Sequence, residues 1–157
     1  FPHHQVAPVR GNVQTRLAKL DRGEYSALVL ACAGLDRLGL ESRISRRFPV
    51  EEMLPAAGQG ILAVQSRADV DTSCLSLFHD PVAAVCLTAE RAFVGALEGG
   101  CSSPVAAHAT VDGDTVTLTG FYVDGEGESY IETSCAACAD AREMGAELAV
   151  RMRRDHP

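Results

Sequence analysis

The chain has 157 residues, of which 46% are hydrophobic and 22% are charged, and its formal net charge is −7. This composition excludes a disordered chain, and the negative charge argues against a nucleic-acid-binding protein. No apolar run approaches the roughly 18 residues that a membrane helix needs. The chain begins without Met or a signal peptide, so we expect a cytoplasmic piece of a longer protein with six reduced cysteines. Residues 1–67 carry a net charge of +3 and residues 68–157 carry −10, so an anion would bind in the first part.

The first forty residues predict alternating strands and helices. The expected elements are a strand at 5–10, a helix at 13–22, a strand at 26–31 and a helix at 34–38. Asn12 is a good N-cap, and Gly23 ends the first helix. This order is typical of a parallel, doubly wound α/β sheet. Two strands cannot form such a sheet, so upstream residues or another chain must add strands, and dimerisation or strand exchange would cover the open edge.

The rest of the chain predicts a small antiparallel domain of the α+β class. Residues 54–60 (LPAAGQG) form a candidate hinge, 61–66 a further strand, and a polar stretch with a short helix reaches His79. The elements that follow are a helix from Asp80-Pro81 to Leu97, strands at 105–111, 115–123 and 129–134, and a helix at 139–153. The order is α-β-β-β-α.

Three arginines fall where an open α/β sheet binds its ligands. Arg10 lies at the carboxyl end of the predicted strand 5–10, Arg16 lies on the next helix, and Arg37 comes after the second strand, at the same edge of the sheet. Together they would bind carboxylates or phosphates, with the helix start adding free N–H groups. The alternative is three unrelated surface arginines.

Two cysteine patterns stand out. Cys101 follows Gly99-Gly100 at the end of a predicted helix, so we expect its thiol to lie on an accessible turn. The alternative is that Cys101 is a small buried side chain, the common role of a free cysteine. The helix C-terminus would raise its pKa, so the pattern does not indicate a strong nucleophile. Cys135 and Cys138 form a CxxC, but without a second pair the zinc or redox interpretation has little support, and no metal site is expected.

The chain resembles porphobilinogen deaminase (hydroxymethylbilane synthase) along nearly its whole length. The matching segments are RGNVQTRL at 10–17, KLD at 19–21, AGLDRLG at 33–39, PAAGQG at 55–60, ERAF at 90–93, LEGGC at 97–101 and PVA at 104–106. Ser103 departs from the branched residue that the family usually has before the proline, at a structural position.

The resemblance implies a three-domain enzyme whose first two domains are doubly wound, like periplasmic binding proteins. Residues 1–60 would be the second half of domain two, 61–78 a returning segment of domain one, and 79–157 domain three. The implied activity is the head-to-tail joining of four porphobilinogen molecules into hydroxymethylbilane, with release of ammonia.

The resemblance also implies the site residues. A dipyrromethane cofactor would be held by a thioether to Cys101. Arg10, Arg16 and Arg37 would bind the carboxylates of the cofactor, the substrate and the growing polypyrrole, and Gln59 would also contact the cofactor. The family's proton-handling aspartate would lie upstream of Phe1, so we expect the fragment to be inactive without the missing N-terminal part. The alternatives left open are a non-catalytic carboxylate-binding module and a CxxC redox or zinc protein.

Overall fold

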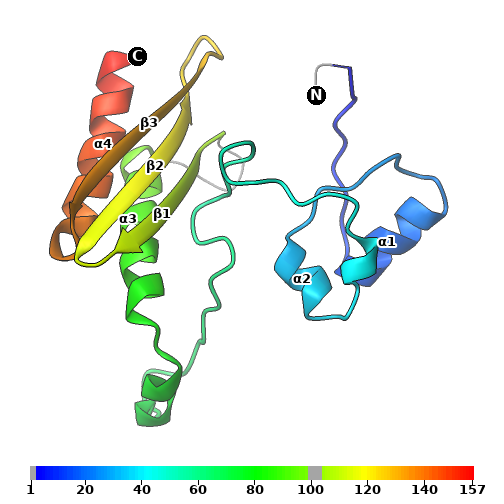
Figure 1. The fold of residues 1–157 in the computed structure, drawn as a ribbon, viewed down its shortest axis with the longest axis horizontal. Coiled ribbons are helices and arrows are strands. Elements are labelled where there is room, and N and C mark those ends of the chain that lie inside the picture. Colours follow the sequence, from blue (N-terminus) through cyan, green and yellow to red (C-terminus); the bar gives the residue numbers. More distant parts are fainter. Residues whose placement is uncertain (1–2, 99–103) are drawn as a thin grey trace. The chain divides into compact units, whose positions relative to one another are not determined.

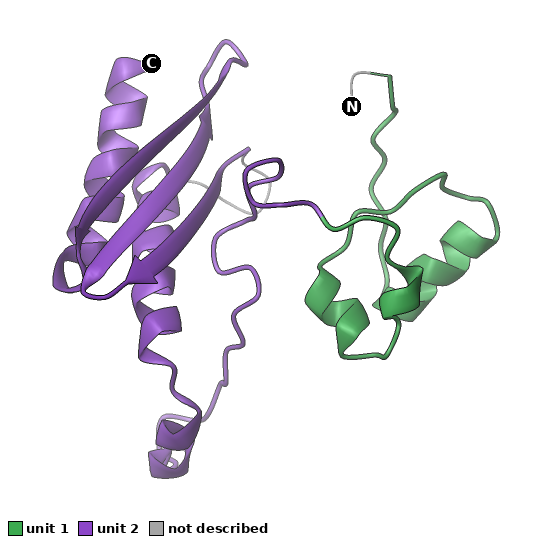
Figure 2. Cartoon of the chain, in the orientation of Figure 1, with its two compact units in different colours: residues 1–47 green, residues 48–157 purple. Residues whose placement is uncertain are grey.

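The chain folds as two compact units, residues 1–47 and residues 48–157 (Figure 2). The structure, a computed structural model, describes residues 3–98 and 104–157. The first unit contains α1 (Val13–Asp21), α2 (Cys32–Asp36) and the 3-10 helix η1 (Glu41–Arg43). The second contains η2 (Ser73–Phe78), α3 (Pro81–Ala96), β1 (Ala106–Asp112), β2 (Thr115–Val123), β3 (Ser129–Ala137), η3 (Cys138–Asp140) and α4 (Ala141–Asp155). None of the helices within the described ranges is long and apolar enough to cross a membrane.

In the first unit, α1 has a well-defined start and end. The Asn12 side chain accepts a hydrogen bond from the Thr15 N–H at 2.8 Å, which satisfies one of the free donors of the first turn. Gly23 follows the helix with φ at +76°, the left-handed conformation that glycine adopts without steric cost.

The second unit is an antiparallel three-stranded sheet in the order β1-β2-β3, with both long helices on one face (Figure 1). Alternation along β2 places Val116 and Leu118 in the core, both fully buried, whereas Thr117 and Thr119 belong to the other face. The two helices supply the rest of the core. Its buried members on the helices are Ala89, Phe93, Ala141, Met144, Leu148, Ala149 and Met152.

Two glycines allow the layers of this unit to pack closely. A methyl group at Gly145 of α4 would lie 2.3 Å from the carbonyl oxygen of Ala89 in α3. A methyl group at Gly120 of β2 would lie 2.5 Å from the ring of Phe93. These positions therefore set the distance between the two helices and the height of the Phe93 ring above the sheet.

The turn between β2 and β3 is organised by Asp124. Its carboxylate accepts hydrogen bonds from the N–H groups of Glu126 and Glu128, each at 2.9 Å, and from the Tyr130 hydroxyl at 3.1 Å. Burial by itself would raise the pKa of Asp124, but the hydrogen bonds from Glu128 and Glu126 outweigh it and hold the pKa below its ordinary value.

The structure confirms the predicted α-β-β-β-α order of the second unit. The bounds of β2 agree with the prediction, and Asp80 caps α3 by accepting from the Ala83 N–H at 3.0 Å. The helices α1, α2 and α4 lie within a few residues of their predicted positions. The third strand was predicted too short, because it continues to Ala137, which pairs with Thr115.

Three strand predictions were wrong for this chain. Segments 5–10, 26–31 and 61–66 form no strand in the described part of the structure. A strand needs a hydrogen-bonded neighbour, and the three described strands pair only with one another. Apolar side chains that the predicted strands would have buried are exposed instead: Val29 is 62% exposed, Leu62 73% and Val64 67%.

Candidate functional site

The start of α1 gathers positive charge at one corner of the first unit. Gly11 has φ at +121°, and a methyl group there would lie 2.9 Å from the Thr15 side chain, so the turn into the helix requires glycine. Arg16 folds back over this turn and donates from Nε to the Gly11 carbonyl at 2.8 Å. Lys19 reaches the same place, with its Nζ 3.4 Å from the Arg10 carbonyl oxygen. The cationic groups of Arg16 and Lys19 thus lie at the backbone of Arg10 and Gly11, and we call Arg10, Arg16 and Lys19 the cationic corner.

The predicted arginines differ from their neighbours in having no acidic partner among the residues that the structure describes. Within residues 3–98 and 104–157, no carboxylate forms an ion pair with Arg10, Arg16 or Arg37. Other arginines of the same unit do have such partners, each within 4 Å: Arg22 pairs with Glu24, Arg43 with Asp21 and Arg47 with Asp36. An arginine without a carboxylate keeps its forked N–H groups for an external anion.

The Arg47–Asp36 pair illustrates this difference. Arg47 donates to both carboxylate oxygens of Asp36, at 2.7 and 3.3 Å. This hydrogen bonding lowers the pKa of Asp36 below its ordinary value and raises that of Arg47. The Arg47 guanidinium is therefore already occupied by an internal anion.

Arg37 lies at the end of α2 and is exposed. The helix packs near the start of α1, because a methyl group at Gly34 would lie 3.6 Å from the Val13 side chain. No hydrogen bond joins Arg37 to the cationic corner in the part of the chain that the structure describes. The structure thus places the Arg16 and Lys19 side chains against the Arg10-Gly11 backbone, and it places α2, which Arg37 ends, next to the start of α1.

In the second unit, Gln59 lies on a turn that is attached to the sheet and to α3. The Ala107 N–H donates to the Pro55 carbonyl at 3.1 Å, and the Gly58 N–H donates to Glu90 Oε2 at 2.7 Å. The second oxygen of Glu90 accepts from the Ala109 N–H at 2.8 Å. The Gln59 side chain itself is exposed, one residue beyond this anchored position.

Cys101 and the flanking residues 99–103 lie outside the described residues, so the attachment prediction has no geometry here. The helix that leads to it ends at Ala96, and Leu97 is its C-cap. Glu98 adopts a left-handed conformation with φ at +55°. This conformation is unfavourable for a residue that carries a side chain, as Glu98 does.

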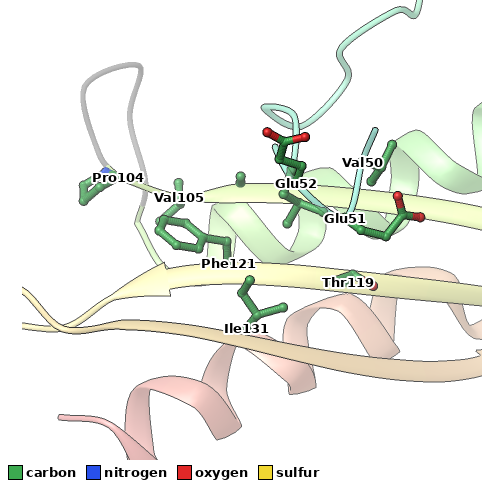
Figure 3. Close-up of a pocket in the computed structure, with 10 residues that line it drawn as sticks. Val50, Glu51, Glu52, Pro104, Val105, Thr119, Phe121 and Ile131 are labelled. Carbon is green, nitrogen blue, oxygen red and sulfur yellow. The ribbon is translucent and has the colours of Figure 1, made fainter. Parts of the chain in front are cut away.

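A cavity of about 370 Å³ lies beside the open face of the sheet (Figure 3). Apolar side chains of the sheet, Phe121 and Ile131, form part of its lining, and Glu51 and Glu52 lie at its rim with their carboxylates pointing away from them. None of its lining residues is cationic. The cavity is therefore unsuited to a ligand with several carboxylates, and the cationic corner remains the better candidate.

The CxxC interpretation gains no support from the geometry. Cys135 is exposed on β3, whereas Cys138 is half-buried in η3. Across the described ranges, no group of three His, Cys, Asp or Glu side chains could hold a metal ion.

Two residues near these sites were not predicted as site residues, although both stand in segments that match the family. Lys19 lies three positions after Arg16 on the same helix face, a spacing visible in the sequence. Glu90 is 5% exposed, and a charged residue on a helix is ordinarily taken to face solvent. Nothing in the sequence shows that its carboxylate accepts hydrogen bonds from two distant segments.

Two protein-family models match the chain. The first is described as porphobilinogen deaminase, dipyromethane cofactor binding domain, and matches residues 1–74. The second is described as porphobilinogen deaminase, C-terminal domain, and matches residues 84–154.

Curated relatives agree with these matches. The porphobilinogen deaminase of Alkaliphilus oremlandii is 54% identical over 153 residues, which cover 98% of this chain and 52% of the relative. That of Acetivibrio thermocellus is 52% identical, covering 97% and 52%, and that of Burkholderia thailandensis is 44% identical, covering 98% and 49%. The chain spans about half the length of these relatives. On this similarity and on both family models, the chain belongs to the porphobilinogen deaminase family.

Proposed function

We propose that this chain contributes the carboxylate-binding and cofactor-attachment parts of a porphobilinogen deaminase. The reaction joins four porphobilinogen molecules head to tail into hydroxymethylbilane and releases ammonia at each step. The observation that carries the proposal is the cationic corner, where Arg10 and Arg16 have no acidic partner within the described residues. Porphobilinogen is a dicarboxylate, and each added pyrrole brings two more negative charges.

The residues at the corner fit a dipyrromethane cofactor, which carries acetate and propionate groups. Nε of Arg16 donates to the Gly11 carbonyl, which restrains the guanidinium, and its two terminal nitrogens are the groups that would pair with a carboxylate. When bound, the cofactor supplies the anchored pyrrole to which substrate units are added. Arg10, Arg16, Lys19 and Arg37 hold carboxylates, and Gln59 offers an amide donor from its exposed turn.

Cys101 is proposed as the attachment residue because it stands in the LEGGC motif at 97–101. A tether reacts once and then only holds the growing chain, so it does not need a strongly lowered pKa. Tethering keeps the reacting end at a high effective concentration.

We propose that turnover needs the remainder of a longer polypeptide. The chain spans about half of each curated relative, and none of its matching motifs contains the proton-handling aspartate that the family resemblance implies. General acid–base catalysis contributes about 10²–10⁴-fold to a rate. In the longer protein, residues 1–60 would belong to domain two, 61–78 to domain one and 79–157 to domain three.

The test compares two arginines of the first unit. We expect Arg16→Ala to weaken the binding of porphobilinogen by about tenfold or more, since a charge-assisted hydrogen bond is lost. Arg22→Ala is the matched control, because Arg22 is already paired with Glu24 and should leave the affinity unchanged. Isothermal titration calorimetry measures both. Equal affinities of the Arg16 variant and the parent chain would refute the assignment.

A second experiment addresses catalysis and attachment. We expect no hydroxymethylbilane from the chain alone, and product when the complementary N-terminal half is added. Intact mass spectrometry should then find a dipyrrole-sized adduct that is lost in Cys101→Ser. Carboxylate binding without adduct or product in the reassembled protein would favour a non-catalytic binding module instead.

A further inference from the structure

Glu90 stands out because it is a buried charged side chain on a helix that otherwise buries apolar residues. In the described ranges it is the one charged residue of the core, 5% exposed beside the fully buried Ala89. A buried carboxylate is unfavourable unless its oxygens accept hydrogen bonds. Both oxygens do so, from the Gly58 N–H and from the Ala109 N–H.

The two donors belong to segments far apart in the sequence. Ala109 lies on β1, which is an edge strand because the sheet order is β1-β2-β3. Gly58 lies on the turn 55–60 that follows the outer edge of β1. The Ala107 N–H donates directly to Pro55 of this turn at 3.1 Å, and two residues further along β1 the Glu90 carboxylate stands between Ala109 and Gly58. Glu90 thus takes the place of a backbone acceptor beside the edge strand.

The turn is held tightly on its other side as well. Gly58 has φ at +75°, and a methyl group there would lie 3.2 Å from Leu87 of α3. The Gln59 N–H donates to the Ala56 carbonyl at 3.0 Å, which closes the turn. Gln59 is therefore fixed relative to α3, and α3 is the helix that leads to Cys101.

From this arrangement we infer that Glu90 is a positioning residue, which acts through Gly58 to hold Gln59 at a defined place relative to the helix that leads to Cys101. The inference deepens the proposed function and rests on it for the role of Gln59. The hydrogen bonds themselves do not depend on the reaction.

Hydrogen exchange measured by NMR on the ¹⁵N-labelled chain tests the positioning without any ligand. Glu90→Gln replaces one carboxylate oxygen by an NH2 group, which cannot accept a hydrogen bond. We expect the amide that faces this group, Gly58 or Ala109, to exchange about tenfold faster or more. In Glu90→Ala both amides should do so, while Leu118 in β2 keeps its protection.

The matched control is Glu147→Gln on α4, where the carboxylate is exposed. It should leave all three amides unchanged. Unchanged exchange of Gly58 and Ala109 in both Glu90 variants would overturn the inference. So would an equal acceleration of Leu118, because that would indicate general loss of stability. If Glu90→Ala does not fold, Glu90→Gln decides.

Titration with porphobilinogen tests the link to Gln59. If Glu90 acts through Gln59, Glu90→Gln weakens binding, and the double variant Glu90→Gln/Gln59→Ala loses no more affinity than Gln59→Ala alone. Losses that add would refute the link. Absence of porphobilinogen binding by the parent chain would refute the proposed function, and the exchange pattern alone would then decide whether Glu90 positions the turn.

Discussion

Replacing Gly145 by alanine is expected to force α3 and α4 apart. The added methyl group would lie 2.3 Å from the Ala89 carbonyl oxygen, whereas ordinary contact begins at 3.4 Å, so one helix must move by about 1 Å. Overpacking against a backbone atom costs about 3 kcal/mol. The better helix propensity of alanine returns about 1 kcal/mol. The net loss of about 2 kcal/mol corresponds to a melting temperature lower by about 8–16 °C for a domain of this size.

Thermal unfolding followed by far-UV circular dichroism measures this shift. Gly95→Ala provides the matched control, because Gly95 also lies on a helix, α3, but a methyl group there meets nothing within 4 Å. We expect this control to melt at the parent temperature or slightly above it. If Gly145→Ala melted no lower than Gly95→Ala, the close approach of the helices at Gly145 would be incorrect.

Further variants test the caps, the core and the β2–β3 turn. Asp80→Ala should destabilise the second unit by about 1 kcal/mol in urea denaturation, because α3 loses its N-cap, whereas Asp80→Asn keeps an acceptor and should cost only a few tenths. Phe93→Ala should lower the free energy of unfolding by about 3–5 kcal/mol, because the ring is fully buried. Phe78→Ala, at a side chain that is 79% exposed, should change it little. Equal effects of the two substitutions would contradict the assignment of Phe93 to the core. Asp124 has a folded-state pKa below its unfolded value, so its carboxylate stabilises the fold above about pH 4 and that contribution is lost as the pH falls through the folded pKa. The stability difference between the parent chain and Asp124→Asn should therefore shrink in acid, and a difference independent of pH would contradict the role of the charge.

The fold of the second unit could be predicted closely from the sequence, because the patterns that define its strands and helices are local. The Asp112-Gly113 turn and the alternation from Thr115 to Val123 define β2 with no reference to distant residues. The stripe of Met144, Leu148 and Met152 likewise defines the buried face of α4. All of these apolar faces find partners within the same unit.

The segments around Val29 and Leu62 show what such signals cannot supply. An apolar run indicates that a segment would be buried in a sheet, but the neighbouring strands must also be present. No neighbouring strand pairs with these segments among residues 3–98 and 104–157, and the side chains of Val29 and Leu62 are exposed. An apolar run therefore predicts that a segment is suited to a buried strand, but it does not show that the strand forms.

The candidate site was likewise only partly predictable from the sequence. The arginines were found because a helix start after an apolar run is a known place for anions. Only the structure shows that Arg22 and Arg47 have acidic partners, whereas Arg16 has none within the described part of the chain. Glu90 could not be found, because its role depends on Gly58 and Ala109, which stand far from it along the chain.

The contact between Ala89 and Gly145 has a consequence for how the second unit forms during synthesis. It joins the first long helix of the unit to the last, and Phe93 on that first helix is covered by Gly120 of the middle strand. While the chain emerges from the ribosome, the apolar face of α3 stays uncovered until α4 has been released. Contacts between distant parts of a chain form slowly, and exposed apolar surface favours aggregation in the meantime. The unit is thus expected to fold in one step after its last helix is complete, and truncation within α4 should yield an aggregating product rather than a shortened domain.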